Sequence, residues 1–184
     1  MKIFKNILKV LLLLVTMSAF SLAEDSAREI NADANKALIE FFSEVSGTKQ
    51  FLAKAKGYVV FPDIKEAGFI FGGKYGEGVL RIGDESKSYH GITSASFGMQ
   101  LGAQEYSLVI VFTSNAALKK FMTDDDWETD MDFNIAMADW NNDEEIDDVD
   151  FGSNMVGFVF DSTGMMGNMT FEGTRFEKIH PDLN

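Results

Sequence analysis

The chain has 184 residues, of which 46% are hydrophobic and 24% charged, as in an ordinary single globular domain. Its 16 basic and 29 acidic residues give a formal net charge of -13, which excludes non-specific nucleic-acid binding because that requires a basic surface. The absence of cysteine excludes disulfides, zinc–thiolate sites, iron–sulfur clusters and cysteine nucleophiles. Only His90 and His180 offer imidazole chemistry.

Residues 1–23 have the pattern of a secretory signal peptide. Lys2, Lys5 and Lys9 precede an apolar stretch from Val10 to Phe20, and Ser21-Leu22-Ala23 supplies small residues for cleavage. The alternative is an uncleaved membrane anchor, but the apolar stretch is about half of the roughly 20 residues that a span needs. We therefore predict cleavage near Ala23, a periplasmic or secreted location, and a single domain over residues 24–184.

Helices are predicted mainly at the start of this domain. Ser26 and Glu29 fit a capping box, and apolar residues then recur at helical spacing until Gly47: Ile30, Ala34, Leu38, Phe41 and Val45. A second short helix is expected from Thr48 to Ala55, and a later one after Ser114 as N-cap.

Most of the remaining chain favours strands joined by turns. The clearest period-two pattern covers Thr129 to Ala138. Pro62-Asp63 is expected to end a strand at Tyr58–Phe61, and Gly83–Ser86 to form a turn. The other expected strands are Ala67–Tyr75, Gly78–Ile82, His90–Phe97, Met99–Gln104, Tyr106–Phe112, Met155–Phe160, Met165–Phe171 and Thr174–Ile179. The pattern predicts an α+β, β-rich fold of about eight mainly antiparallel strands, in a barrel or sandwich with N-terminal helices packed against it.

Glycine is concentrated in this strand-rich region, where nine of the sixteen glycines lie between Gly68 and Gly102. Two interpretations remain open at this point. The glycines permit barrel corners and bulges, or they form a smooth, close-packed surface or groove for a ligand.

Four ordered blocks of sequence resemble the SYLF domain, a lipid-binding family. The blocks are Ala55–Pro62 leading into Lys65–Phe69, Gly72–Leu80, Ser94–Gln104 and Phe171–Thr174. The resemblance extends from about Leu38 to Ile179 and implies binding of phosphoinositide or another anionic lipid, with no known enzyme activity. Yeast members of the family bind actin, and bacterial members are typically exported single-domain proteins. The segment Asp139–Asp150 departs from the family pattern, which is small and glycine-rich there.

The distribution of charge indicates where a lipid surface would be tolerated. Residues 24–90 hold nine basic and eleven acidic residues, whereas residues 91–184 hold four and eighteen. Anionic headgroups would repel the second half. The most basic segment, with Lys65 nearby, holds the predicted lipid-binding residues Lys49, Phe51, Leu52, Lys54 and Lys56, on a short helix suited to an interface. Alternatively, Phe51 and Leu52 pack on the sheet and the lysines are merely solvated.

The acidic segment has a candidate metal site. Oxygen ligands fall at positions 1, 3, 5, 7, 9 and 12 of a twelve-residue window, as in an EF-hand calcium loop; they are Asp139, Asn141, Asp143, Glu145, Asp147 and Asp150. Glu144 replaces the glycine of that loop, and Asp150 is shorter than the usual glutamate. A solvated acidic hairpin loop is the alternative, and no other cofactor is expected.

Catalysis has little support. His90, Ser94 and Ser96 share a strand face by spacing, but no G-x-S-x-G motif accompanies them. We expect an exported, non-enzymatic lipid-binding module that contacts a phospholipid membrane surface and has no identified protein partner. A periplasmic protein-interaction or structural domain without lipid binding, and a calcium-dependent binder, remain alternatives.

Overall fold

The computed structural model describes residues 25–44, 46–68, 71–97, 102–124, 126–128, 136–138, 154–163 and 173–183. The predicted signal peptide therefore lies outside the described residues. The helices are α2 (Ala27–Glu44), α3 (Thr48–Lys54) and α4 (Asn115–Thr123). The strands are β1 (Gly57–Gly68), β2 (Phe71–Ile82), β3 (Glu85–Phe97), β4 (Gly102–Phe112), β5 (Asp126–Glu128), β6 (Ala136–Ala138), β7 (Met155–Thr163) and β8 (Thr174–Ile179).

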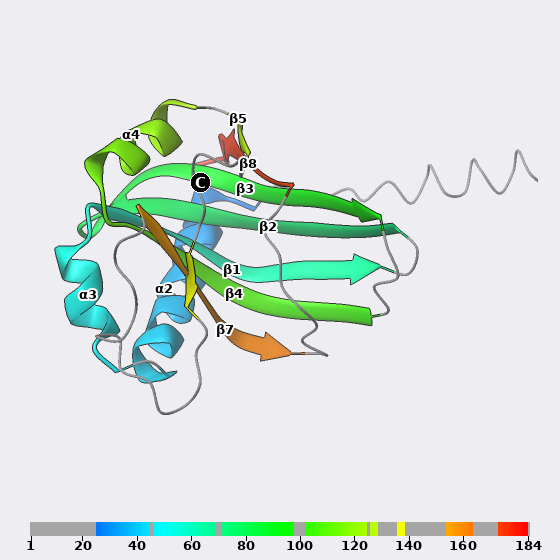
Figure 1. The fold of residues 1–184 in the computed structure, drawn as a ribbon, viewed down its shortest axis with the longest axis horizontal. Coiled ribbons are helices and arrows are strands. Elements are labelled where there is room, and N and C mark those ends of the chain that lie inside the picture. The colour runs from blue at the N-terminus through cyan, green and yellow to red at the C-terminus, as the bar shows by residue number, and fades with distance from the viewer. Residues whose placement is uncertain are drawn as a thin grey trace, which may run out of the picture.

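Six of these strands form one open, twisted antiparallel sheet in the order β8-β3-β2-β1-β4-β7 (Figure 1). The three-residue strands β5 and β6 lie at its two edges, where β5 pairs with β8 and β6 runs parallel to β7. The predicted α+β, β-rich class is confirmed.

The predicted barrel or sandwich is wrong, because the sheet is single and open. The predicted count of about eight antiparallel strands is likewise not confirmed, since six of the described strands form the antiparallel sheet and β5 and β6 have three residues each. Of the strand expected at Thr129–Ala138, the described residues contain only Ala136–Ala138, and the one expected at Met165–Phe171 lies outside them. A barrel would need its edge strands to pair with each other, whereas here helices cover the sheet instead.

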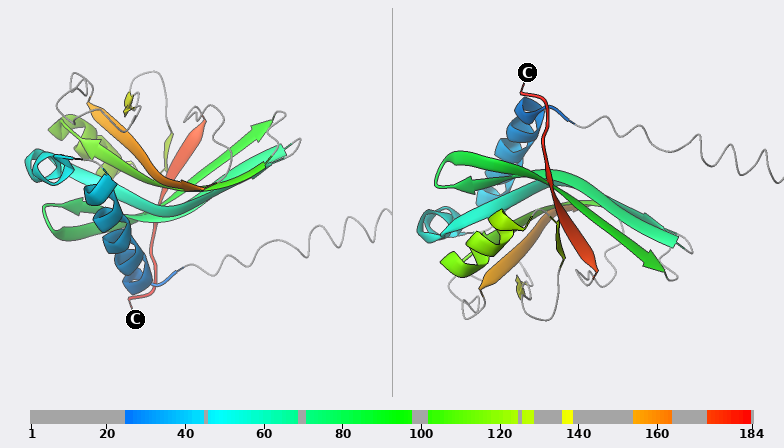
Figure 2. Two further views of the ribbon diagram at one scale, coloured as in Figure 1. Left: turned by 90° about the horizontal axis from the view of Figure 1, so that it is seen from below. Right: turned by 90° about the horizontal axis from the view of Figure 1, so that it is seen from above.

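Helices lie on both sides of the sheet (Figure 2). α2 and α3 pack on one face, where Phe41 and Leu52 join Val60 and Val109 in one core cluster. α4 packs on the other face, where Phe121 joins a second cluster. Consecutive residues of the central strands therefore alternate between two cores: Val59 and Phe61 belong to the second and Val60 to the first. This two-sided burial explains the uninterrupted apolar runs of β1 and β4, which are typical of central strands.

β1 continues through the point where the sequence predicted its end. Its pairing with both β2 and β4 shifts register within residues 61–64, and Asp63 has φ 51°. A bulge of this kind tolerates proline and bends the strand, so Pro62 lies inside β1. The strand expected at Ala67–Tyr75 is also wrong, since β1 ends at Gly68, which pairs with Gly72 of β2.

The helix starts predicted at Ser26 and Ser114 are confirmed, whereas α2 ends at Glu44, before the predicted end at Gly47. The Ser26 backbone N–H and hydroxyl donate to Glu29 Oε2 at 3.0 and 2.8 Å, and the Glu29 N–H donates to Ser26 Oγ at 3.3 Å. In α4, Ser114 Oγ accepts from the Ala117 N–H at 3.2 Å. The Ala27 N–H donates to Asp182 O at 2.8 Å, which holds the end of the chain against the start of α2 (Figure 2).

Candidate functional site

α3 is a short helix held firmly between α2 and the start of the sheet. Gly47 precedes it with φ 84°, a left-handed conformation that glycine adopts without strain. After the helix, the Lys56 N–H donates to Phe112 O at 2.9 Å, so the chain enters β1 in register with β4. The lysines of α3 are therefore displayed on an ordered element.

The five predicted lipid-binding residues separate into two groups. Leu52 is 7% exposed in the core, and Phe51 packs against the same core with its ring 5.9 Å from that of Phe158. Lys49, Lys54 and Lys56 are exposed. The structure thus places the apolar pair inward as an anchor and leaves the three lysines, which we call the α3 lysines, facing solvent.

Lys65 is separated from the α3 lysines. It lies eight residues along β1 from Gly57, roughly 25 Å at about 3.3 Å per strand residue. Although exposed, it faces a different part of the surface. Lys65 is close to the other lysines in the sequence, but the extended strand β1 separates it from them in space.

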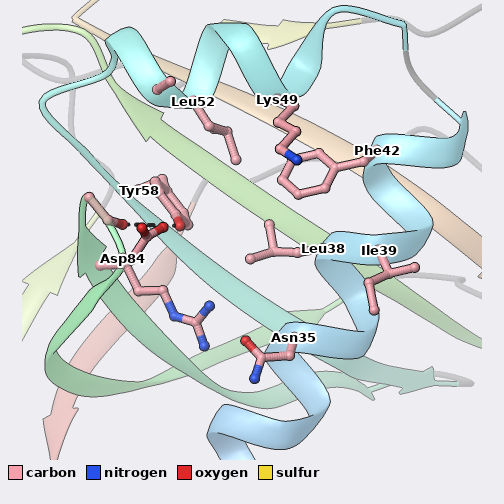
Figure 3. A pocket seen from close by; sticks show the side chains of 11 residues that line it. Asn35, Leu38, Ile39, Phe42, Lys49, Leu52, Tyr58 and Asp84 are labelled. Atoms are coloured by element: carbon pink, nitrogen blue, oxygen red, sulfur yellow. Dashed lines mark hydrogen bonds between the residues drawn. The ribbon is translucent and has the colours of Figure 1, made fainter.

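A pocket of about 460 Å³ opens beside the α3 lysines. One stripe of α2 at helical spacing faces a similar stripe of α3 across it, and Lys49 reaches from α3 toward Phe42 (Figure 3). The inner wall comes from β1, β2 and the turn after β2. The lining residues are Asn35, Leu38, Ile39, Phe42, Lys49, Leu52, Ala53, Tyr58, Arg81, Gly83 and Asp84.

Arg81 is the most unusual residue of this pocket. It is 8% exposed, yet its Nε has no hydrogen-bond partner in the described part of the chain. Its Nη2 donates to Asn31 Oδ1 at 3.3 Å and to Asn31 O at 3.5 Å, and both acceptors are neutral. No carboxylate in the described part of the chain forms an ion pair with this guanidinium.

Asn31 fixes the position of Arg81. Its Oδ1 also accepts from Ser86 Oγ at 2.7 Å, while its Nδ2 donates to Ala27 O and Tyr89 Oη at 2.7 Å each. The amide is thus held by α2 and β3, and it orients the guanidinium without neutralising it.

Tyr58 forms the wall next to Arg81. Its hydroxyl donates to Gly83 O at 3.3 Å. Burial raises the pKa of Tyr58, and the charge of Arg81 opposes that rise while Asp84 adds to it. Tyr58 therefore stays neutral at physiological pH and offers an apolar ring to the pocket.

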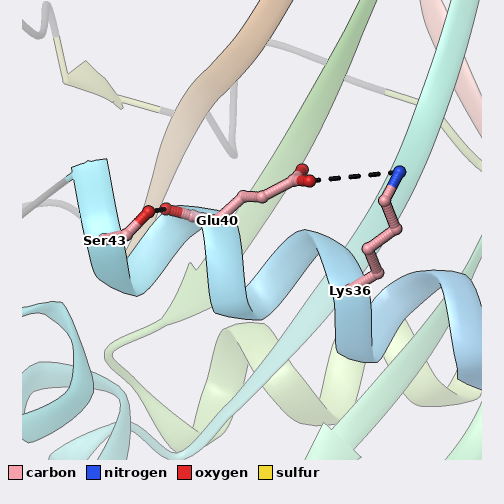
Figure 4. Close-up of polar contacts among 3 residues, drawn as sticks. All are labelled: Lys36, Glu40 and Ser43. Atoms are coloured by element: carbon pink, nitrogen blue, oxygen red, sulfur yellow. Dashed lines mark hydrogen bonds and ion pairs between the residues drawn. The ribbon is translucent and has the colours of Figure 1, made fainter.

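The other flank of α2 carries the carboxylates Asp33 and Glu40, and Figure 4 shows the contact of Glu40 with Lys36. Desolvation, and then the charge of Asp63, raise the pKa of Asp33. Desolvation, and then the charge of Asp161, raise the pKa of Glu40. Lys36 Nζ lies 3.9 Å from Glu40 Oε1, an exposed pair of little energetic weight. An anion is thus disfavoured on this flank and favoured on the side of the pocket and the α3 lysines.

The candidate calcium ligands from Asp139 to Asp150 lie outside the described residues. Within the described ranges, no three His, Cys, Asp or Glu side chains gather as a metal site. None of the described helices combines the length and apolar character that a bilayer span requires.

His90 is a core residue. It is 2% exposed, its Nε2 lies 2.8 Å from Ser88 Oγ, and its ring centroid lies 4.5 Å from that of Phe121. Ser94 lies further along the same strand, and the side chain of Ser96 is not described. The polar strand face expected at His90 is therefore partly a packing surface under α4.

The pocket and Arg81 were not predicted from the sequence. Recognising them requires α2, α3 and the end of β2 to be brought together in space. One local signal was present, since Arg81 is the single charged residue in the apolar run Val79–Ile82. A charged residue in a strand that is buried on both faces is rarely found without a polar or charged partner.

Comparison with known families supports the resemblance seen in the sequence. Residues 93–182 match the family model Ysc84, described as Las17-binding protein actin regulator. No curated protein matches the chain. The match begins in β3 and includes β4, α4, β7 and β8, so these elements are similar to the Ysc84 family over residues 93–182.

Proposed function

We propose that this domain is an exported, non-enzymatic module that binds anionic phospholipid at a membrane surface through the α3 lysines. The observation that carries the proposal is the exposure of Lys49, Lys54 and Lys56 on one short, anchored segment of a chain with net charge -13. The lipid-binding character of SYLF domains supports the same function.

The distribution of charge around α2 favours one orientation of the domain on an anionic membrane. The acidic flank with Asp33 and Glu40 points away from an anionic surface when the α3 lysines approach it. Ile39, which is 69% exposed, lines the same pocket as Lys49 and supplies apolar contact at its rim. Phe51 and Leu52 serve as the anchor that keeps α3 in position.

The electrostatic contribution is modest, as in a reversible membrane contact. A lysine near an anionic surface contributes about 1 kcal/mol, so the three together contribute about 3 kcal/mol before the repulsion of distant acids is subtracted. The contact should weaken as salt shortens the Debye length from about 10 Å at 0.1 M to about 3 Å at 1 M.

The test is co-sedimentation with anionic and with zwitterionic vesicles in the presence of a chelator. Lys54→Glu with Lys56→Glu replaces two attractions by two repulsions. The binding free energy should become less favourable by about 4 kcal/mol, which lowers the affinity for anionic vesicles roughly a thousandfold. The matched control is Lys65→Glu with Lys119→Glu, two exposed lysines on β1 and α4. The charge change is the same, so equal losses in the two variants would refute a role specific to α3.

Calcium is tested in the same experiment. Pelleting that requires calcium would favour the candidate loop at Asp139–Asp150, and Asp139→Ala with Asp143→Ala should then abolish it. No pelleting in any condition would favour a protein-interaction or structural domain without lipid binding.

A further inference from the structure

We infer that the pocket between α2 and α3 binds a single-chain amphiphile with a carboxylate head, and that Arg81 is the ligand of that carboxylate. The inference rests on the proposed function, since it names a lipid site beside the membrane-facing α3 lysines. It concerns one molecule held inside the domain, whereas the α3 lysines concern the surface of a bilayer.

The first argument is the state of Arg81. A guanidinium removed from water requires compensation of its charge, and the acceptors it has, both on Asn31, are neutral. Its Nε donor remains unused although Arg81 is 8% exposed. A carboxylate bound in the pocket would accept from the guanidinium and supply the missing negative charge, in the pairing that arginine favours.

The second argument is the wall of the pocket. Leu38, Ile39, Phe42 and Leu52 supply an apolar surface from two helices, and Tyr58 adds its ring. Ile39 is 69% exposed, which is unusual for a residue flanked by other large apolar side chains. A volume of about 460 Å³ lies within the roughly 300–1,000 Å³ of small-molecule sites. An acyl chain would cover this surface, which a free inorganic anion would leave exposed.

The rim sets the charge of the head group. Lys49 favours an anion, while Asp84 opposes it. Both side chains are exposed, so each acts through water and changes affinity by a modest factor. The positive charges of Lys49 and Arg81 and the negative charge of Asp84 together favour a head group with one negative charge over a head group with two.

The test is calorimetric titration of the purified protein with decanoate below its micelle concentration, without vesicles. The methyl resonances of Leu38 and Ile39 report whether the ligand enters the pocket. Decanol has the chain without the charge, whereas acetate and inorganic phosphate have the charge without the chain. We expect decanoate to bind and each of the other probes to bind at least tenfold more weakly.

Three variants identify the ligand residue. Arg81→Gln should weaken decanoate binding by about tenfold or more, the loss expected for a charge-assisted hydrogen bond, and should leave decanol unaffected. Asp84→Asn should strengthen decanoate binding and Lys49→Glu should weaken it, each by a few fold. The variants at Asp84 and Lys49, which are exposed, test whether decanoate binds at this pocket even if Arg81→Gln does not fold.

Decanoate that leaves the Leu38 and Ile39 resonances unmoved would overturn the inference. So would a folded Arg81→Gln that binds decanoate normally, or rim variants with effects of the opposite sign. The vesicle test is independent, since Lys54→Glu with Lys56→Glu should leave decanoate binding unchanged. Vesicle binding without decanoate binding would refute the pocket alone, and the reverse would refute only the membrane contact.

Discussion

Gly78 is the position at which the packing of the sheet can be tested most sharply. A Cβ added there would lie 2.3 Å from Val60 O and 2.5 Å from Phe61 Cδ1, whereas ordinary contact begins near 3.4 Å. The neighbouring backbone would have to retreat by 3.4 - 2.3 = 1.1 Å. Val60 and Phe61 are fully buried and pair with β4, so that movement would strain the centre of the sheet.

We therefore expect Gly78→Ala to lower the free energy of unfolding by about 3 kcal/mol or more, at or above the usual range for overpacking. In urea this shifts the unfolding midpoint by about 1–3 M, given ordinary m-values. Gly73→Ala is the matched control on the same strand, because its added Cβ would meet only Ser94 O at 3.7 Å. Its stability should stay within about 0.5 kcal/mol of the unmodified protein. Equal midpoints for the two variants would refute the close approach of β1 and β2.

Three further changes test other parts of the structure by urea unfolding. Ser26→Ala removes the cap of α2 and should cost about 1 kcal/mol at pH 7. Hydrogen bonds from Ser26 lower the pKa of Glu29, so the stabilisation by the cap is fully present above the ordinary carboxyl pKa. It should be lost as the pH falls through the lowered pKa of Glu29. A cost of Ser26→Ala that does not change with pH would contradict this pairing. Arg81→Met should change the stability of the ligand-free protein by less than about 1 kcal/mol, because no described carboxylate loses its partner, and a loss above about 3 kcal/mol would show that the charge is already paired. Leu52→Ala should cost about 2–5 kcal/mol if α3 is anchored as described, and a cost near zero would show that it is not.

Local signals in the sequence predicted local structure well. The Ser26 capping box, the Ser114 cap, the turn at Gly83 and the strand Thr174–Ile179 all depend on residues close in the chain, and all are confirmed. The strand end predicted at Pro62 is wrong, because proline is uncommon inside strands but is tolerated at a bulge such as the one in β1.

Tertiary arrangement was predicted less well. A continuous apolar run such as Tyr106–Phe112 is compatible with a barrel, a sandwich or a sheet covered on both faces, and only the packing of helices on the two faces distinguishes them. Gly76 and Gly78 face buried side chains of β1, so these two glycines serve close packing.

The candidate site was predicted in part. Charge counting located the α3 lysines, which are exposed, but could not show that Phe51 and Leu52 turn inward or that Lys65 lies far along β1. The lining of the pocket comes from α2, α3, β1 and β2, and the contact that holds Arg81 joins residues 50 positions apart, so no short pattern in the sequence contains the pocket.

The central proposal is that this domain binds anionic membranes through electrostatic attraction. The most direct measurement is the affinity of the unmodified protein for anionic vesicles, in chelator, as a function of salt. The account predicts binding at 0.1 M salt that weakens steadily toward 1 M, with no binding to zwitterionic vesicles at either. Equal affinity for both vesicle types, or binding unaffected by salt, would contradict it.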